Sequence, residues 1–206
     1  DMTGRAQALL TYAGEVDGNG KTDDDLAYRR GEREFCNHLI NEQPNGDFAH
    51  TIARLLFVAT YEYLFYSELM RSADERLASI AAKVVKESRY HMTHANDWAI
   101  RLGNGTDESQ RRMQAAIDAL WMFTGEMFET DAVDALLRDK NIAVDLGKIK
   151  PVWMERITEM VKMSGLSMPE GAYMQSGGLK GIHTEYLGHM LTEMQYLQRA
   201  YPDAAW

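Results

Sequence analysis

The sequence predicts an all-α protein, and three observations carry this prediction. The four prolines and sixteen glycines fall mostly in short clusters, which leaves long stretches without either residue. Within these stretches apolar residues recur every three or four positions, the spacing of one helix face. No convincing alternation of apolar and polar residues, the pattern of a half-buried strand, occurs. Because 206 residues with 45% hydrophobic content suit one sizeable core, we expect a single domain over residues 1–206.

Turn clusters rich in Gly, Asn, Asp and Pro divide the chain into a series of expected helices. Asp47 and either Thr106 or Asp107 are plausible N-caps, and Gly103 is a plausible C-cap. The helix that contains residues 54–68 is apolar nearly all round, which places it at the centre of a bundle. The expected ranges are 2–15, 30–42, 48–71, 75–102, 107–129, 131–138, 148–164 and 182–200, of which 48–71, 75–102, 107–129 and 182–200 are the long bundle helices.

Composition excludes several classes of protein. The net charge is -9 and no basic run occurs, so we expect no nucleic-acid partner. The single cysteine, Cys36, rules out an intrachain disulfide and fits a reducing cytoplasm. No segment resembles a signal peptide or a membrane span, so we expect a cytoplasmic protein without a membrane partner. The chain starts at Asp1 inside an expected helix, and we expect further residues upstream.

Ligand-type residues lie on the expected core stripe of the helix over residues 75–102. Glu87 and His91 stand four residues apart on this stripe, one helical turn from each other. Glu62 is the only charge in the central part of the preceding helix. Buried carboxylates need hydrogen bonds, cations or a metal ion as partners. Counted in alternating steps of three and four, the stripe comprises Leu77, Ile80, Val84, Glu87, His91, His94 and Trp98.

These residues do not complete the pattern of a di-iron site. Ferritin-like di-iron bundles use a Glu from each of two helices and Glu-x-x-His from two others. This chain spaces its pairs by four, and Tyr90 stands where the first histidine should be. On the last helix the apolar stripe leaves the second pair in solvent, and Glu126 flanks its own stripe. The available donors are Glu62, Glu87 with His91, Glu126, and Glu185 with His189, and the last stripe comprises Tyr186, Leu187, Met190, Met194 and Leu197.

Two interpretations of the interior donors stay open. Lys83 lies one turn before Glu87 and could supply the missing positive charge as an ammonium group. Glu62, Lys83, Glu87 and His91 would then form a buried polar network without metal, the remnant of a metal site. The alternative is an autonomous di-iron oxidase or oxygenase that uses Glu62, Glu87 and His91.

A further helix carries more apolar surface than one core stripe needs. The chain has thirteen methionines and four tryptophans, and such residues fill cores but also cover partner surfaces. The segment 151–163 is therefore a candidate partner interface, although packing within its own domain explains it equally well. An exposed apolar face would also favour self-association. The candidate interface residues are Val152, Trp153, Ile157, Met160 and Val161.

Several stretches, spread over nearly the whole chain, resemble one family. They include Glu-Gln-Pro-Asn-Gly-Asp-Phe-Ala at 42–49, Lys-Glu-Ser-Arg-Tyr-His at 86–91 and Arg-Leu-Gly-Asn-Gly-Thr at 101–106. Near the end they include His-Thr-Glu-Tyr-Leu-Gly at 183–188, Glu-Met-Gln-Tyr-Leu-Gln-Arg at 193–199 and the final Trp206. Together they are similar to the C subunits of the multicomponent ring 1,2-phenylacetyl-CoA epoxidases, the phenylacetic acid degradation protein C family.

The resemblance implies a ferritin-like helical bundle of the bacterial multicomponent monooxygenase type. It implies a structural subunit without catalytic residues or cofactor of its own. A homologous sister subunit would hold the di-iron centre and bind the acyl-CoA, and a flavin and iron–sulfur reductase would supply electrons. The complex would epoxidise the aromatic ring of phenylacetyl-CoA with O₂. Members of this family carry additional N-terminal helical sequence, which agrees with the expectation of residues upstream of Asp1.

Overall fold

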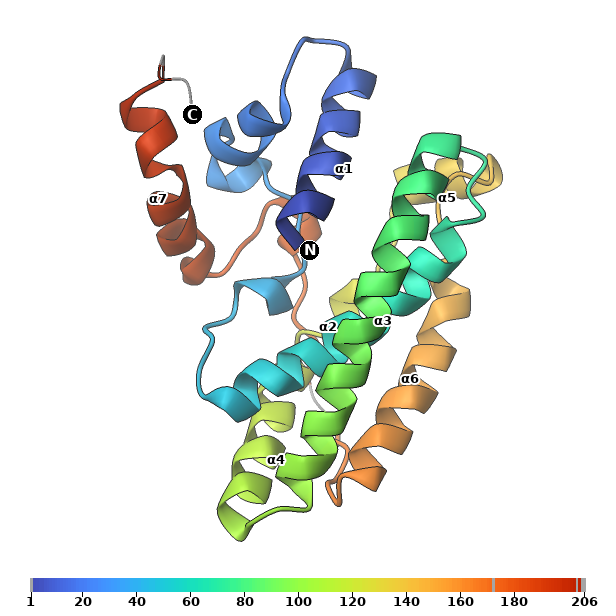
Figure 1. The fold of residues 1–206 in the computed structure, drawn as a ribbon, viewed down its shortest axis with the longest axis vertical. Coiled ribbons are helices and arrows are strands. Elements are labelled where there is room, and N and C mark those ends of the chain that lie inside the picture. Colours follow the sequence, from blue (N-terminus) through green and yellow to red (C-terminus); the bar gives the residue numbers. More distant parts are fainter. Residues whose placement is uncertain (1, 172, 203, 205–206) are drawn as a thin grey trace. The chain divides into compact units, whose positions relative to one another are not determined.

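The computed structural model describes residues 2–171, 173–202 and 204, and all regular structure in this part of the chain is helical. The prediction of an all-α protein is therefore confirmed. None of the described helices is long and apolar enough to cross a membrane. The long helices are α1 (Met2–Asp17), α2 (Phe48–Leu69), α3 (Glu75–Gly103), α4 (Asp107–Trp121), α5 (Ala132–Asp139), α6 (Leu146–Met163) and α7 (Glu185–Ala200) (Figure 1). The short turns of helix are η1 (Asp25–Arg29), η2 (Glu32–Glu34), η3 (Leu39–Glu42), η4 (Gly125–Phe128) and η5 (Gly178–Lys180).

The chain divides into two compact units. Unit 1 comprises Asp1–Pro44 together with Ser176–Trp206, and unit 2 comprises Asn45–Gln175. Both boundaries fall in turn clusters rich in Gly and Asn or Ser, where a chain bends at low cost. The expectation of a single domain over residues 1–206 stays a prediction.

The central helix of unit 2 is α2, as its apolar composition predicts. It packs against α3, α4 and α6 (Figure 1). An aromatic cluster fills the space between these helices. The rings of Trp121 and Trp153 stack with centroids 5.9 Å apart, and Phe128 meets Trp153 edge-on at 5.2 Å. The indole N–H of the buried Trp153 donates a hydrogen bond of 3.0 Å to the backbone oxygen of Phe57, which satisfies its one polar atom.

Helix ends in unit 2 follow local chemistry that the sequence predicts in part. Asp47 caps α2 by accepting from the backbone N–H of His50, and this hydrogen bond lowers the pKa of Asp47. Thr106 caps α4 in the same way through the N–H of Ser109. Gly103 is the last residue of α3 instead of its C-cap, and a Cβ there would collide with the backbone oxygen of Ser164. Only glycine lets the ends of α3 and α6 approach this closely.

Two predicted helices are wrong in extent. The expected helix over 107–129 ends at Trp121, where the buried hydroxyl of Thr124 donates to the Trp121 carbonyl and the chain turns into η4. The expected helix over 30–42 consists of η2, η3 and extended residues between them. The side chains of Asn37 and Glu42 in this segment bind each other, and Glu42 also binds the distant Thr184. Such polar side chains compete with regular helix formation.

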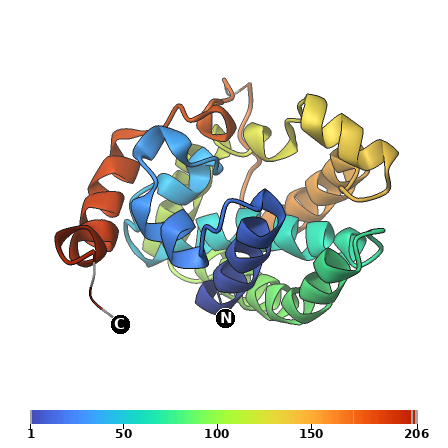
Figure 2. The ribbon, with the colours of Figure 1, turned by 90° about the horizontal axis from the view of Figure 1, so that it is seen from above.

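Unit 1 is organised around α7, which lies beside η1 (Figures 1 and 2). The buried side chain of Gln195 donates hydrogen bonds to the backbone oxygens of Ala27 at 3.1 Å and Arg30 at 3.0 Å. Arg199 donates a further hydrogen bond of 2.9 Å to the Arg30 oxygen. The segment around η1 contains no long helix or strand. Side chains of α7 therefore satisfy backbone carbonyl groups of this segment.

The buried face of α7 differs from the predicted stripe. Leu187, Leu191 and Gln195 are buried, at steps of four along the helix. Of the stripe predicted from the sequence, Leu187 alone lies inside, and Tyr186, Met190, Met194 and Leu197 are exposed. Compared with the prediction, the helix is rotated about its axis so that Gln195 faces inward. At that position Gln195 forms hydrogen bonds that a methionine could not form.

A buried acid–histidine pair ties the start of α7 to η3. The side chains of Glu42 and His183 are each 1% exposed, and Glu42 Oε1 lies 2.7 Å from His183 Nδ1. His183 Nε2 lies 2.9 Å from the backbone oxygen of Phe35, which can only accept, so Nε2 carries a proton.

Glu42 is fully satisfied inside unit 1. Its Oε1 also accepts from the side-chain amide of Asn37 at 2.8 Å. Its Oε2 accepts from both the backbone N–H and the hydroxyl of Thr184, each at 2.7 Å. Four polar groups from three residues thus converge on one carboxylate, and Thr184 is the N-cap residue of α7. This cluster fixes where α7 begins.

The packing of α6 gives a first testable prediction. Ile157 is fully buried, so Ile157→Ala should lower the free energy of unfolding by about 2–5 kcal/mol through the cavity it leaves. Val152→Ala on the exposed side of the same helix should change it by less than about 0.5 kcal/mol. Urea denaturation of both variants measures the difference. Equal losses would show that the inward face of α6 is misassigned.

The Glu42 cluster gives a second prediction. Glu42→Gln replaces an acceptor by an amide group that faces donors, and removing one partner of such a buried pair costs about 3–5 kcal/mol. Hydrogen exchange at the Thr184 amide, which donates to Glu42, should accelerate first. Glu32→Gln, at an exposed carboxylate of the same unit, is the matched control and should leave both readouts unchanged. Unchanged Thr184 exchange in Glu42→Gln would contradict the cluster.

Candidate functional site

The ligand-type residues of α2 and α3 are less buried than the sequence predicts. Lys83 is exposed, and Glu62, Glu87 and His91 are half-buried. The predicted core stripe of α3 is correct at Ile80 and Val84, but beyond Val84 the buried row lies one position later than predicted. The buried residues of α3 are Ile80, Ala81, Val84, Ser88, Ala95, Ala99 and Gly103, a row made largely of small side chains.

Small residues explain this error. A row of Ala, Ser and Gly attracts little notice in a hydrophobicity pattern, yet it lets two helices approach closely. The larger Glu87, His91 and Trp98 therefore lie toward the edge of the interface. Lys83 reaches solvent without cost, so its ammonium group is not a buried counter-charge for Glu87, and Lys83→Met has no reason to destabilise the fold strongly.

The donors do not have the arrangement that a di-iron centre needs. Among the residues that the structure describes, no three His, Cys, Asp or Glu side chains gather where they could hold a metal ion. A di-iron site needs six such donors pointing into one bundle interior, so the arrangement around Glu62, Glu87 and His91 does not fit the group. Tyr90, at the position of the expected histidine, is exposed and its ring stacks near His94. That this chain binds no iron stays a prediction.

The remaining donors of the pattern also lie apart. Glu185 and His189 of α7 are exposed, as the sequence predicts. Glu126 is buried, which the sequence did not predict. The prediction continued the helical periodicity of α4 past Thr124, but the residues there belong to η4. The sequence did not reveal Glu42 and His183 either. Their pairing spans most of the chain, and no local pattern marks it.

The candidate partner interface on α6 requires correction. Trp153, Ile157 and Val161 are buried inside unit 2, so they cannot form the exposed face that we predicted. Met160 is half-buried, and Val152 alone of the five residues is exposed. The alternative interpretation, packing of α6 within its own part of the chain, accounts for this placement.

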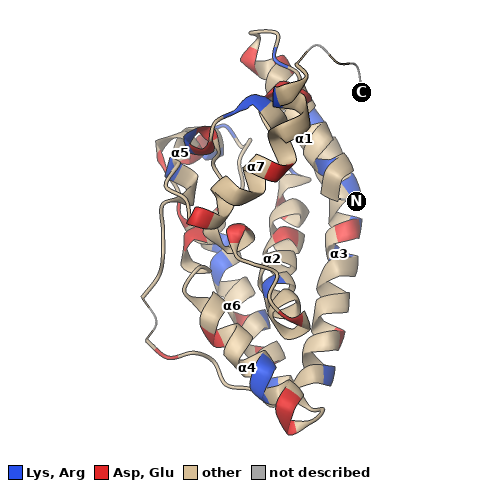
Figure 3. Cartoon of the chain, turned by 90° about the vertical axis from the view of Figure 1, so that its left-hand side faces the viewer, with Lys and Arg blue, Asp and Glu red and all other residues tan. Residues whose placement is uncertain are grey.

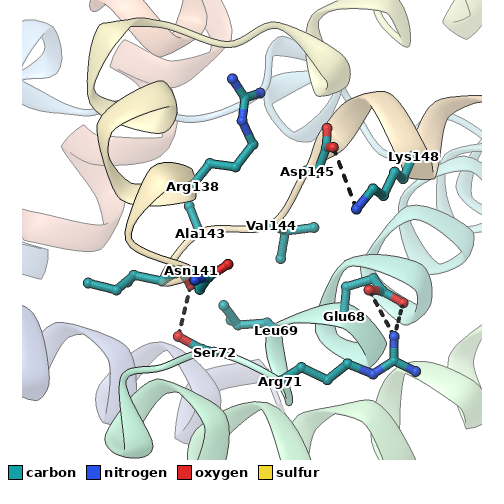
Figure 4. A pocket seen from close by; sticks show the side chains of 11 residues that line it. Glu68, Leu69, Arg71, Ser72, Arg138, Asn141, Ala143, Val144, Asp145 and Lys148 are labelled. Carbon is teal, nitrogen blue, oxygen red and sulfur yellow. Dashed lines mark hydrogen bonds and ion pairs between the residues drawn. The ribbon is translucent and has the colours of Figure 1, made fainter.

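A polar depression opens on unit 2 between the end of α2, the end of α5 and the start of α6 (Figure 4). Its volume is about 190 Å³. Glu68 pairs with Arg71 at 3.0 Å, and Asp145 lies 3.9 Å from Lys148. These charged groups neutralise each other in exposed ion pairs, which are weak and solvated. The depression thus has the character of ordinary polar surface.

The flank of α7 beside its buried face is the apolar feature that stands out on unit 1. Four large side chains lie on it at steps of four, four and three, and each has a substantial exposed fraction. They are Tyr186 at 39%, Met190 at 44%, Met194 at 39% and Leu197 at 48%, and we call them the outer stripe of α7. Single exposed apolar residues are ordinary, but an aligned row on one helix marks a surface suited to binding another protein.

Comparison with known proteins agrees with the resemblance noted in the sequence. Residues 1–206 match the family model described as phenylacetic acid catabolic protein. A relative from Escherichia coli (strain K12), the C subunit of 1,2-phenylacetyl-CoA epoxidase, is 45% identical over 206 residues, which cover 100% of this chain and 83% of the relative. The all-helical structure is the one expected of this ferritin-like helical family. The chain therefore belongs to the phenylacetic acid catabolic protein family.

Proposed function

We propose that this chain is a non-catalytic, structural subunit of a phenylacetyl-CoA ring epoxidase in aerobic phenylacetate catabolism. In this proposal it works in the cytoplasm, pairs with a homologous subunit that holds the di-iron centre, and supports the structure of that subunit. A separate flavin and iron–sulfur reductase supplies the electrons. This chain itself carries no cofactor.

The observation that carries the proposal is the identity of 45%, over the full length of the chain, to the C subunit of such an epoxidase. The placement of the donors supports the non-catalytic role, because Glu62, Glu87 and His91 are half-buried and, within the described part of the chain, do not gather into a metal cradle. We therefore assign no step of ring epoxidation to a residue of this chain.

The competing function is an autonomous di-iron oxidase or oxygenase that uses Glu62, Glu87 and His91. It requires those three side chains to move from the edge of the α2–α3 interface into its interior. It also requires further carboxylate ligands, since three donors are too few for two iron ions. Iron content and the effect of ligand substitutions distinguish the two functions.

Iron analysis is the third prediction. The chain purified alone from iron-supplemented cells should retain well under about 0.1 iron per chain after dialysis, because a site of this type needs a full donor set. The complete epoxidase complex, purified in parallel, is the positive control and should retain iron. Near-stoichiometric iron in the isolated chain would overturn the structural role in favour of the autonomous enzyme.

Substitution of the former ligand positions is the fourth prediction. In the reconstituted complex, Glu62→Gln and Glu87→Gln in this chain should each change the epoxidation rate by less than about twofold, because neither carboxylate acts on the substrate. Loss of a true iron ligand would instead cost about 10²-fold or more. The rate is measured as oxygen consumption dependent on phenylacetyl-CoA, with thermal melting to confirm that both variants fold. A large loss of rate with an unchanged melting temperature would assign the chain a catalytic site.

A further inference from the structure

The outer stripe of α7 is only partly covered by its own chain, whereas other residues of the helix are buried or hydrogen-bonded within unit 1. The inner face is fixed by Leu187 and Leu191, which are buried, and by the hydrogen bonds of Gln195 to unit 1. The first turn is fixed by Thr184 on Glu42, and the last by Arg199 on the Arg30 oxygen. The helix is thus secured along its length by one side. Tyr186, Met190, Met194 and Leu197 lie beside this inner face and keep 39–48% of their surface exposed.

The chemistry of the stripe fits a helical partner. Its spacing of four, four and three residues is that of a continuous ridge along an α-helix, which packs into the groove of a second helix. Methionine side chains adapt to irregular apolar surfaces, and tyrosine adds a large ring with a polar tip. When two amphipathic helices pair in this way, apolar side chains from both helices become buried at their contact.

Charge selects between a second copy of this chain and a different subunit. The chain carries a net charge of -9, and acidic residues outnumber basic ones in both units. Figure 3 shows how acidic and basic residues are interspersed along the helices. On α7 the exposed carboxylates of Glu185 and Glu193 flank the stripe. Two copies joined through α7 would bring these carboxylates and two acidic molecules together, and this opposes association.

We propose that the outer stripe of α7 is the docking surface for another subunit of the epoxidase, through an apolar helix face bordered by lysine or arginine. This inference rests on the proposed function and adds to it the surface of this chain that meets the partner. Glu185 and Glu193 contribute orientation and the rate of association, and the four apolar side chains contribute the affinity. The Glu42 cluster serves the same end because it sets the position at which α7 starts.

The test measures binding of the full chain to the other purified subunits of its epoxidase by titration calorimetry. The double variant Met190→Glu and Met194→Glu places two carboxylates in the apolar contact, and the Kd for the partner should rise at least about tenfold. Glu193→Lys should weaken binding by a smaller factor and reduce its dependence on salt. The matched control, Val133→Glu with Leu136→Glu, alters apolar residues of α5 that are 59% and 55% exposed and should leave the Kd within about twofold.

Each outcome bears on a different statement. If the wild-type chain binds none of the other subunits, the proposed function fails. If the wild-type chain binds and the α7 variant binds equally well, the docking surface is wrong while the structural role stands. Equal weakening by the α5 control would also overturn the assignment to α7.

A melting temperature of the isolated α7 variant well below that of the α5 control would overturn the assignment as well, because the stripe would then be packed within its own chain. Sedimentation of the isolated wild type as a dimer that the α7 variant abolishes would identify a second copy as the occupant and overturn the proposal.

Discussion

The structure of unit 2 depends on how closely α3 packs on α2. The buried face of α3 consists largely of small residues, whose short side chains let the helices approach. This contact fixes the rotation of α3 about its axis. Rotation in turn decides which of its longer side chains lie inside, and it leaves Glu87 and His91 half-buried with Lys83 in solvent. The placement of the ligand-type side chains is thus decided in large part by small residues that carry no chemistry of their own.

The sequence was sufficient for the fold class and for most of the long helices. Their start signals are local, as at Asp47 and Thr106, and local signals can be recognised without knowing the fold. Rotation about a helix axis is a tertiary property, so the predicted stripe of α3 is wrong beyond Val84 and that of α7 is wrong except at Leu187. In α7 the reason is a polar side chain, since the buried position of Gln195 depends on the carbonyl groups of Ala27 and Arg30.

The hydrogen-bonded pair of Glu42 and His183 could not be predicted from the sequence for the same reason, because such a contact is a tertiary property. Glu42 and His183 lie far apart in the sequence, and their neighbourhood is an interrupted helix on one side and a glycine-rich turn on the other. Nothing in either segment alone identifies a partner. Both residues fall within stretches that resemble the C subunits of the epoxidases, so the resemblance marked the right segments although it could not give the contact.

The two sides of α7 illustrate how an apolar helix face can stay exposed on a folded chain. Polar atoms hold part of the inner side, where Gln195 and Arg199 satisfy backbone oxygens of a segment that has little regular structure. The helix therefore does not need its full apolar content to stay attached. Met190 and Met194 lie beside that inner side and stay 44% and 39% exposed. A ridge of apolar side chains that the chain itself covers only in part is consistent with a helix whose exposed surface is completed by another subunit.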